Sequence, residues 1–237
     1  MSPFTRLAIP LALMTTLVAL AVPAADRRET RAATGFTAIG LTAPVNVDLT
    51  QGDVEGLVVE GDQAALADLE TVVEGGTLKI RTRSRKAVPG MSKVRVHVRA
   101  KTIDALRISG SGDINAPTLR APTLKIAVSG SGDLRIGELD ATTVDVSVAG
   151  SGDVLVGGKA DTLSTSIAGS GDVNAGKLAA RTAKVSIAGS GDVTLWAREQ
   201  LSVSVVGSGD VHFYGDPEVK RSILGTGSVR RLGATPS

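Results

Sequence analysis

Gly110-Ser111-Gly112-Asp113-Ile114 is the first of six nearly identical segments in this chain of 237 residues. Each segment ends in an aspartate followed by an apolar residue, and the six aspartates are Asp113, Asp133, Asp153, Asp172, Asp192 and Asp210. The intervals between them are 20, 20, 19, 20 and 18 residues, and a degenerate seventh copy lies at Gly225-Thr226-Gly227-Ser228. A near-constant period of this length predicts an array of stacked structural units.

The residues around each motif alternate between apolar and polar, which is the period of a β-strand with one buried face. The apolar positions lie nine, seven and five residues before the aspartate, as in Leu124, Ile126 and Val128, and one and three residues after it, as in Ile114 and Ala116. The same offsets recur in every unit, which favours a stack of parallel coils over a meander of hairpins. We therefore predict an all-β fold, a right-handed parallel β-helix or solenoid with coils of about 20 residues.

The composition agrees with this fold. Apolar residues make up 42% of the chain but aromatic residues only 2%, so the core must consist of Val, Ile, Leu and Ala, which form thin regular layers. The absence of cysteine excludes disulfides, thiol catalysis and cysteine-ligated metals. The net charge of +2 is too small to indicate binding to nucleic acid. One Trp and one Tyr also provide no platform on which bases could stack. We expect no nucleic-acid partner, no metal and no cofactor.

Residues 1–25 resemble a cleaved secretory signal. Arg6 precedes the apolar run Leu7–Val22, and Val22-Pro23-Ala24 provides the small residues typical of a cleavage site. An uncleaved membrane anchor is the alternative, disfavoured because the run is short and contains Pro10. We expect a periplasmic, cell-surface or secreted protein with no transmembrane segment in its mature chain.

The first half of the chain lacks the motif but also alternates like strands, at residues 36–41, 45–49, 56–60, 77–84 and 93–101. Gln51-Gly52-Asp53-Val54 is interpreted as a degenerate copy of the motif corner. Residues 63–70 are helix-forming and lack β-branched side chains, so they predict one short helix.

These segments predict one structural domain. The predicted divisions are a signal at 1–25, a polar mature N-terminus at 26–33, a single β-solenoid domain at 34–232 and a tail at 233–237. Within the domain, residues 34–103 form irregular first coils and a cap, and residues 104–232 form the motif repeats.

The motif aspartates need local partners, since six carboxylates at one offset of a stack would lie about 5 Å apart and repel one another. Our first interpretation is a structural turn, in which each carboxylate accepts hydrogen bonds from backbone N–H groups of its own Gly-Ser-Gly corner. A column of calcium ions bound by aspartate, serine and carbonyl oxygens is the second, although the spacing differs from the nonapeptide calcium repeat. Catalysis by these residues is disfavoured, because a catalytic site is a local departure from a repeat.

The first half separates its charges. Residues 45–78 contain eight acidic residues and no basic one, whereas residues 79–101 contain nine basic residues and no acidic one. If the two basic strands pair through a turn at Pro89-Gly90, their cations share one exposed face, which either the preceding acids or an anionic glycan, lipid head group or other envelope component would neutralise. The candidate ligand-binding residues of this face are Lys79, Arg81, Arg83, Arg85, Lys93, Arg95 and Arg99.

Departures from the repeat are few. They follow the fifth and sixth motifs and comprise Trp196, Arg198, Glu199, His212, Phe213 and Tyr214. His212 and Glu199 are a conceivable acid/base pair, but a terminal cap that covers the end of the core is favoured. The sequence has no recognisable nucleophile motif, phosphate loop or metal-ligand cluster, so no catalytic residue is predicted.

The succession Phe36–Ile39, Val45–Asp53, Val58–Asp62, Leu78–Ile80 and Ile108–Asp113 resembles the bacterial GIN-domain family of auto-transporter adhesin head domains over residues 34–232. The resemblance implies a β-helix-like fold in an envelope or surface protein and carries no catalytic residues with it. We expect an exported, non-enzymatic binding or scaffold protein of the bacterial cell envelope, adhesin-like in role. A polysaccharide-acting β-helix lyase or hydrolase is the alternative.

Overall fold

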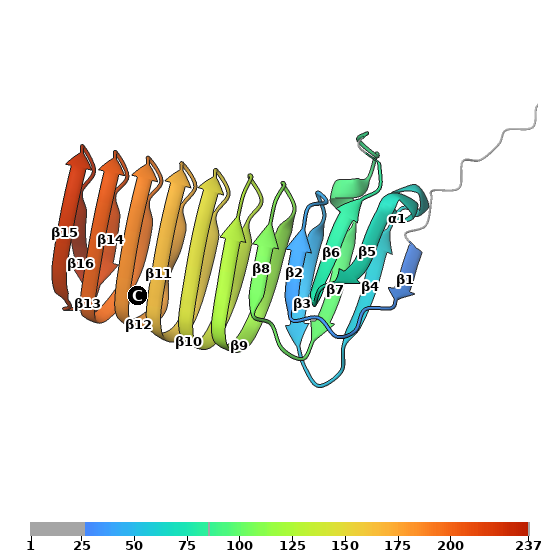
Figure 1. The fold of residues 1–237 in the computed structure, drawn as a ribbon, viewed down its shortest axis with the longest axis horizontal. Coiled ribbons are helices and arrows are strands. Elements are labelled where there is room, and N and C mark those ends of the chain that lie inside the picture. The colour runs from blue at the N-terminus through green and yellow to red at the C-terminus, as the bar shows by residue number, and fades with distance from the viewer. Residues whose placement is uncertain (1–26, 85, 237) are drawn as a thin grey trace, which may run out of the picture.

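The computed structural model describes residues 27–84 and 86–236, so the predicted signal at 1–25 and the candidate Arg85 lie outside the described residues. The chain forms a β-solenoid of about 6 turns with coils of about 20 residues, shown from the side in Figure 1 with its long axis horizontal. The predicted fold class is confirmed. No helix within the described residues is long and apolar enough to cross a membrane.

Five long strands carry the motif repeats: β9 (Asp113–Val128), β10 (Leu134–Gly150), β11 (Val154–Gly169), β12 (Val173–Gly189) and β13 (Val193–Gly207). The first part of β9 pairs with a different neighbour from its last part, because each long strand bends from one broad face of the rod to the other. Successive long strands pair in parallel and in register, with Leu134 opposite Val154 and Val148 opposite Ile167. The predicted stack is therefore confirmed over the meander. The last coils are formed by β14 (Val211–Tyr214), β15 (Glu218–Gly225) and β16 (Val229–Gly233).

The core contains the side chains at the predicted inward offsets. Leu124, Ile126 and Val128 are buried in the first complete coil, and Val211 and Phe213 are buried near the last. Full burial of one such side chain contributes about 1.5–3 kcal/mol, so each added coil stabilises the rod by burying its own layer. One continuous cluster of buried residues extends from Ala33 to Phe213.

The motif forms one corner of each coil, at the edge of the rod where the arrowheads of the long strands β9–β13 lie in Figure 1. Gly150 has a φ of 144°, which disfavours a side chain. A Cβ on Gly152 would lie only 2.2 Å from the carbonyl oxygen of Gly132. Both glycines are therefore required because the backbone of one corner packs directly on the backbone of the corner before it.

The first half extends both broad faces of the same rod. One face continues through β8 (Ala105–Ile108), β2 (Ala38–Leu41), β6 (Thr77–Thr82) and β5 (Leu69–Glu74). The other continues through β3 (Asn46–Gln51), β7 (Arg95–Ala100), β4 (Gly56–Gly61) and β1 (Arg27–Arg31).

The N-terminal end of the rod is closed by antiparallel strands and a helix. The helix α1 (Gln63–Asp68) confirms the predicted helix, and its buried Ala65 and Leu66 join the core. A short 3-10 turn, η1 (Met91–Lys93), lies in the connection between β6 and β7. The sequence did not predict β1 or β5, which add antiparallel pairs at this end.

The predicted corner at Gln51–Val54 is wrong. Asn46 pairs with Asp113, so Thr42–Val45 occupies the place of the motif corner, and a Cβ on Gly110 would lie 2.8 Å from the carbonyl oxygen of Thr42. Gln51 lies at the opposite corner of the coil. Its side-chain amide accepts from the backbone N–H of Arg120 at 2.8 Å and donates to the Arg120 carbonyl at 3.0 Å. The prediction failed because a similarity of four residues to the motif carries no information on the register of the neighbouring strands.

Candidate functional site

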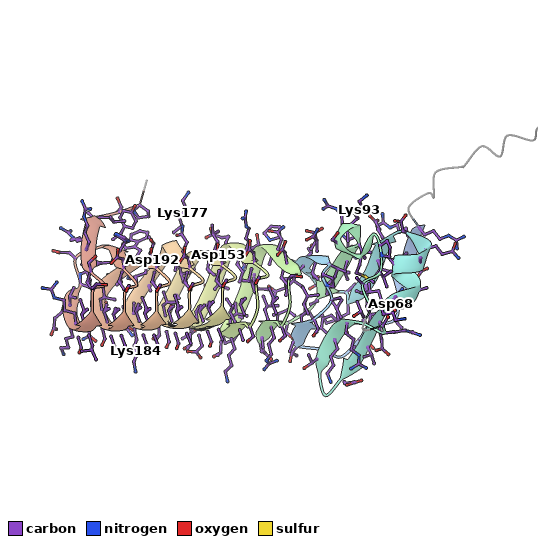
Figure 2. The ribbon with its side chains drawn as sticks, turned by 90° about the horizontal axis from the view of Figure 1, so that it is seen from above. Asp68, Lys93, Asp153, Lys177, Lys184 and Asp192 are labelled. Carbon is purple, nitrogen blue, oxygen red and sulfur yellow. The ribbon has the colours of Figure 1, made fainter. Side chains whose placement is uncertain are left out.

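The motif aspartates form a ladder of hydrogen bonds along the rod. The Oδ1 atom of Asp113 accepts from the backbone N–H of Asp133 at 2.9 Å, and that of Asp133 accepts from Asp153 at 3.1 Å. The same bond recurs from coil to coil until the N–H of Ser228 donates to Asp210 at 2.8 Å. Figure 2 shows Asp153 and Asp192 in one row along the rod, with Lys177 on one broad face and Lys184 on the other.

The carboxylates bind the next coil and not their own turn, which corrects the sequence interpretation. Because the two glycines let the backbones of successive corners pack together, the N–H of the following aspartate lies within hydrogen-bond distance of the carboxylate. The residue after each aspartate adds a second bond between coils; for example, Leu134 donates its N–H to the Asp153 carbonyl at 2.9 Å. Each of the six aspartates therefore joins two coils by a hydrogen bond.

The ladder ends at the last coil. Hydrogen bonds from the backbone N–H and the hydroxyl of Ser228 lower the pKa of Asp210, opposed by desolvation and aided by the charge of His212.

In the part of the chain that the structure describes, no three His, Asp or Glu side chains are grouped so as to hold a metal ion.

The predicted basic face is not a single surface. β6 pairs with β2 and β5, whereas β7 pairs with β3 and β4, so the turn at Pro89-Gly90 carries the chain from one broad face to the other. The hairpin on which the prediction depended is wrong. The candidate cations are divided: Lys79 and Arg81 on β6, Arg95 and Arg99 on β7, and Arg83 and Lys93 in the connection. Their role in ligand binding stays a prediction.

Acidic neighbours neutralise the cations of β6. The Lys79 Nζ atom lies 2.5 Å from Glu74 Oε2, and the Arg81 Nε atom lies 2.6 Å from Glu70 Oε2. The hydrogen bond from Lys79 lowers the pKa of Glu74, and the hydrogen bond to Glu70 raises the pKa of Arg81. The expected compensation by the preceding acidic block is confirmed for this strand.

Two side chains of β7, Arg95 and His97, also have acidic neighbours. Arg95 lies 3.9 Å from Asp48 Oδ2. His97 lies between two carboxylates, with Nδ1 3.6 Å from Asp48 and Nε2 3.4 Å from Glu60. Each ring nitrogen of His97 thus faces a carboxylate from a different strand, Asp48 on β3 and Glu60 on β4.

A groove runs along the second corner, at the edge of the rod opposite the motif. It has a volume of about 560 Å³ and receives residues from all five strands β9–β13. Small alanines line it between charged side chains, and those charged residues are Arg120, Asp140, Lys159, Asp161, Arg181 and Arg198. Sequence reasoning missed this groove because its polar residues do not repeat. One sequence signal could have revealed the groove. At one position of the repeat, residues of different types follow one another from coil to coil, whereas most other positions keep the same type.

The acid/base pair that the sequence left as an alternative to a terminal cap is not formed. Glu199 Oε2 lies 3.2 Å from Arg181 Nη1, whereas His212 lies in register with Thr194, farther back along β13. The prediction of a terminal cap is wrong for Trp196 and Tyr214, which are partly exposed on the side of the rod. The last coil, formed by β15 and β16, stacks beyond them.

The fold and its surfaces define a parallel β-solenoid whose repeated polar groups hold its coils together. The family described as "Putative auto-transporter adhesin, head GIN domain" matches residues 35–217. The chain belongs to this family, and the predicted resemblance is confirmed. A comparison with curated proteins found no match.

Solved structures share the whole fold. A "putative adhesin" from Bacteroides fragilis is 24% identical with a TM-score of 0.81, covering 87% of this chain and 97% of its own. A "putative lipid binding protein" from Parabacteroides distasonis is 26% identical with a TM-score of 0.76, covering 89% and 98%. A "putative adhesin" from Parabacteroides merdae is 18% identical with a TM-score of 0.71, covering 89% and 97%.

Proposed function

We propose that this chain is an exported, non-enzymatic binding or scaffold protein of the bacterial cell envelope with an adhesin-like role. The names of the family and of two solved relatives support the adhesin-like part. A stack of coils also provides long, regular side surfaces, which are suited to binding extended partners.

The observation that carries the proposal is the aspartate ladder. Each motif carboxylate already accepts a backbone N–H of the next coil, as Asp153 does from Asp172 at 3.0 Å. Such a carboxylate is held in place as an acceptor and is used identically in every coil, whereas acid/base catalysis needs a carboxyl group placed against one substrate atom. The repeated use of these carboxylates therefore supports a role in holding the coils together. The side surfaces of the rod stay available for contact with a partner.

The proposal is tested by incubating the protein with envelope material, namely peptidoglycan, lipopolysaccharide and an acidic capsular polysaccharide. We expect at least one of them to bind without the formation of new reducing ends or unsaturated sugars. New products would contradict the non-enzymatic role, and no binding to any of the three would contradict the binding role.

A polysaccharide-acting enzyme is the second candidate, favoured by the groove. It gathers unlike polar groups from several coils, among them the carboxylates of Asp140 and Asp161. Glycan cleavage needs two such groups, an acid and a base or nucleophile. Activity that is lost in Asp140→Asn or Asp161→Asn but kept in Asp153→Asn would support this candidate.

A further inference from the structure

The groove along the second corner follows one register column. Arg120 lies opposite Asp140, Asp140 opposite Lys159, and Lys159 opposite Ala179. Neighbouring strands are about 4.8 Å apart, so a groove crossing five strands is about 19 Å long. A second hollow of about 500 Å³ shares Arg120 and extends this edge to Lys101 in the first half. The whole feature is linear and runs parallel to the axis of the rod.

The charges of the groove favour an anion. Four cations and two carboxylates line it, and part of this charge is paired, since Lys159 Nζ lies 3.2 Å from Asp140 and Arg181 lies 3.2 Å from Glu199. Arg198 forms no ion pair with any residue that the structure describes. Its guanidinium can therefore donate a bidentate pair of hydrogen bonds to a carboxylate.

An aromatic pair continues the column at its C-terminal end. Trp196 lies opposite Ala179 on one side and opposite Tyr214 on the other, and these are the one Trp and the one Tyr of the chain. Both are partly exposed. Glycines lie beside both rings: a Cβ on Gly215 would be 3.4 Å from Trp196 Cδ1, and one on Gly176 would be 3.6 Å from Tyr214 Cε2. The rings thus pack against bare backbone, and the electron-rich face of an aromatic ring attracts the C–H groups of a sugar.

We propose that this groove, which is lined from Arg120 to Arg198 and has Trp196 in register with its lining residue Ala179, binds a linear glycan that carries carboxylate groups. The inference rests on the binding role proposed above and names its surface and ligand class. A chain of acidic sugars matches a shallow, linear groove with separated cations and an aromatic platform at one end. A lipid is disfavoured because charged side chains alternate with the alanines of the lining, so the open groove provides no continuous apolar surface for an acyl chain. A β-strand peptide is disfavoured because the backbones at this corner already pair with neighbouring coils.

The test uses oligogalacturonides, which are linear acidic glycans, and their methyl esters, which have the same backbone without charge. Binding is measured by calorimetry for the full chain and for Trp196→Ala and Arg198→Gln. Arg135→Gln is the matched control, since Arg135 is exposed on a broad face outside the groove. All three substitutions are at surface positions, and the melting temperature shows whether each variant is folded.

We expect the oligogalacturonide to bind, its methyl ester to bind at least about tenfold more weakly, and Trp196→Ala and Arg198→Gln each to weaken binding about tenfold. Arg135→Gln should stay within about twofold of the unsubstituted chain. No binding of the oligogalacturonide, or equal binding by the groove variants, would overturn the inference. Polyglutamate or phosphatidylglycerol vesicles that bind as tightly, with the same dependence on Trp196, would also overturn it in favour of a peptide or a lipid.

Failure of the inference differs visibly from failure of the proposed function. If oligogalacturonides do not bind but one of the envelope materials does, the ligand class is wrong and the binding role stands. If glycan binding persists in the groove variants but is lost in Arg99→Gln, the ligand class stands and the surface is wrong.

Discussion

Replacing Thr165 by valine should stabilise the protein. Thr165 occupies an inward position on β11, where it is 1% exposed, and its Oγ1 atom has no hydrogen-bond partner within the described residues. Its register neighbours in the adjacent coils are Val146 and Val185, so the surrounding layer already accommodates valine. Valine has the shape of threonine without the polar atom.

The expected change in the free energy of unfolding follows from removing the buried hydroxyl of Thr165. A buried polar group without a partner costs about 1–3 kcal/mol, and a methyl group in its place adds buried apolar surface. We expect Thr165→Val to raise the free energy of unfolding by about 1–2 kcal/mol, which is about 2–8 °C in Tm for a domain of this size. Urea denaturation followed by circular dichroism measures the change, and the m-value should stay constant.

Two variants control this experiment. Val185→Thr places a hydroxyl in the same column and should destabilise by about 1–3 kcal/mol. Thr162→Val removes a hydroxyl that lies 3.4 Å from that of Thr182 and should not stabilise. A Thr165→Val protein that is less stable than the unsubstituted chain would refute the reasoning, because it would mean that the hydroxyl is satisfied inside the core.

Three further predictions concern the motif corner. Gly152→Ala should cost about 3 kcal/mol in denaturant unfolding, because its Cβ has no space, whereas Gly52→Ala, with no atom within 4 Å of its Cβ, should change stability by less than about 1 kcal/mol. Asp153→Ala should be less stable than Asp153→Asn by about 1 kcal/mol, since both lose the charge but only asparagine keeps an acceptor for the N–H of Asp172; equal stabilities would contradict the ladder. The pKa of Asp210 is lower in the folded protein than its usual value of 3.8, so ionised Asp210 stabilises the fold at pH values above 3.8. This stabilisation is lost as the pH falls through the lower folded pKa. Acid titration of unfolding should therefore show a smaller loss below pH 3.8 in Asp210→Asn, and an unchanged curve would count against that bond.

The repeat made most of the fold predictable from sequence. Constant offsets, such as those of Ile126 and Val128, report burial directly because every coil meets the same neighbours. The irregular first half was less predictable. Its strands were located by alternation, but pairing depends on which face each strand occupies, and the sequence around Pro89-Gly90 is compatible with either a hairpin or a crossover.

The candidate site was less predictable than the fold for a related reason. An aspartate after glycine is suited both to a hydrogen bond within its own turn and to a hydrogen bond with the next coil. The sequence therefore could not show which backbone N–H donates to the carboxylate. The groove depends on Arg120, Asp140 and Lys159, which are unlike residues that only the stacking brings together. Such a set has no pattern along the chain.

Hydrogen exchange of the motif amides tests most directly whether the aspartates join successive coils. In the unsubstituted protein the amide of Asp172 should be protected, because its N–H donates to Asp153 Oδ1. In Asp153→Ala, NMR should show protection lost at Asp172 while the amides of Ser151 and Gly152 keep theirs, since they donate to the Gly130 carbonyl. Loss of protection at Ser151 and Gly152 with Asp172 unchanged would show that the carboxylate serves its own turn and would contradict the account.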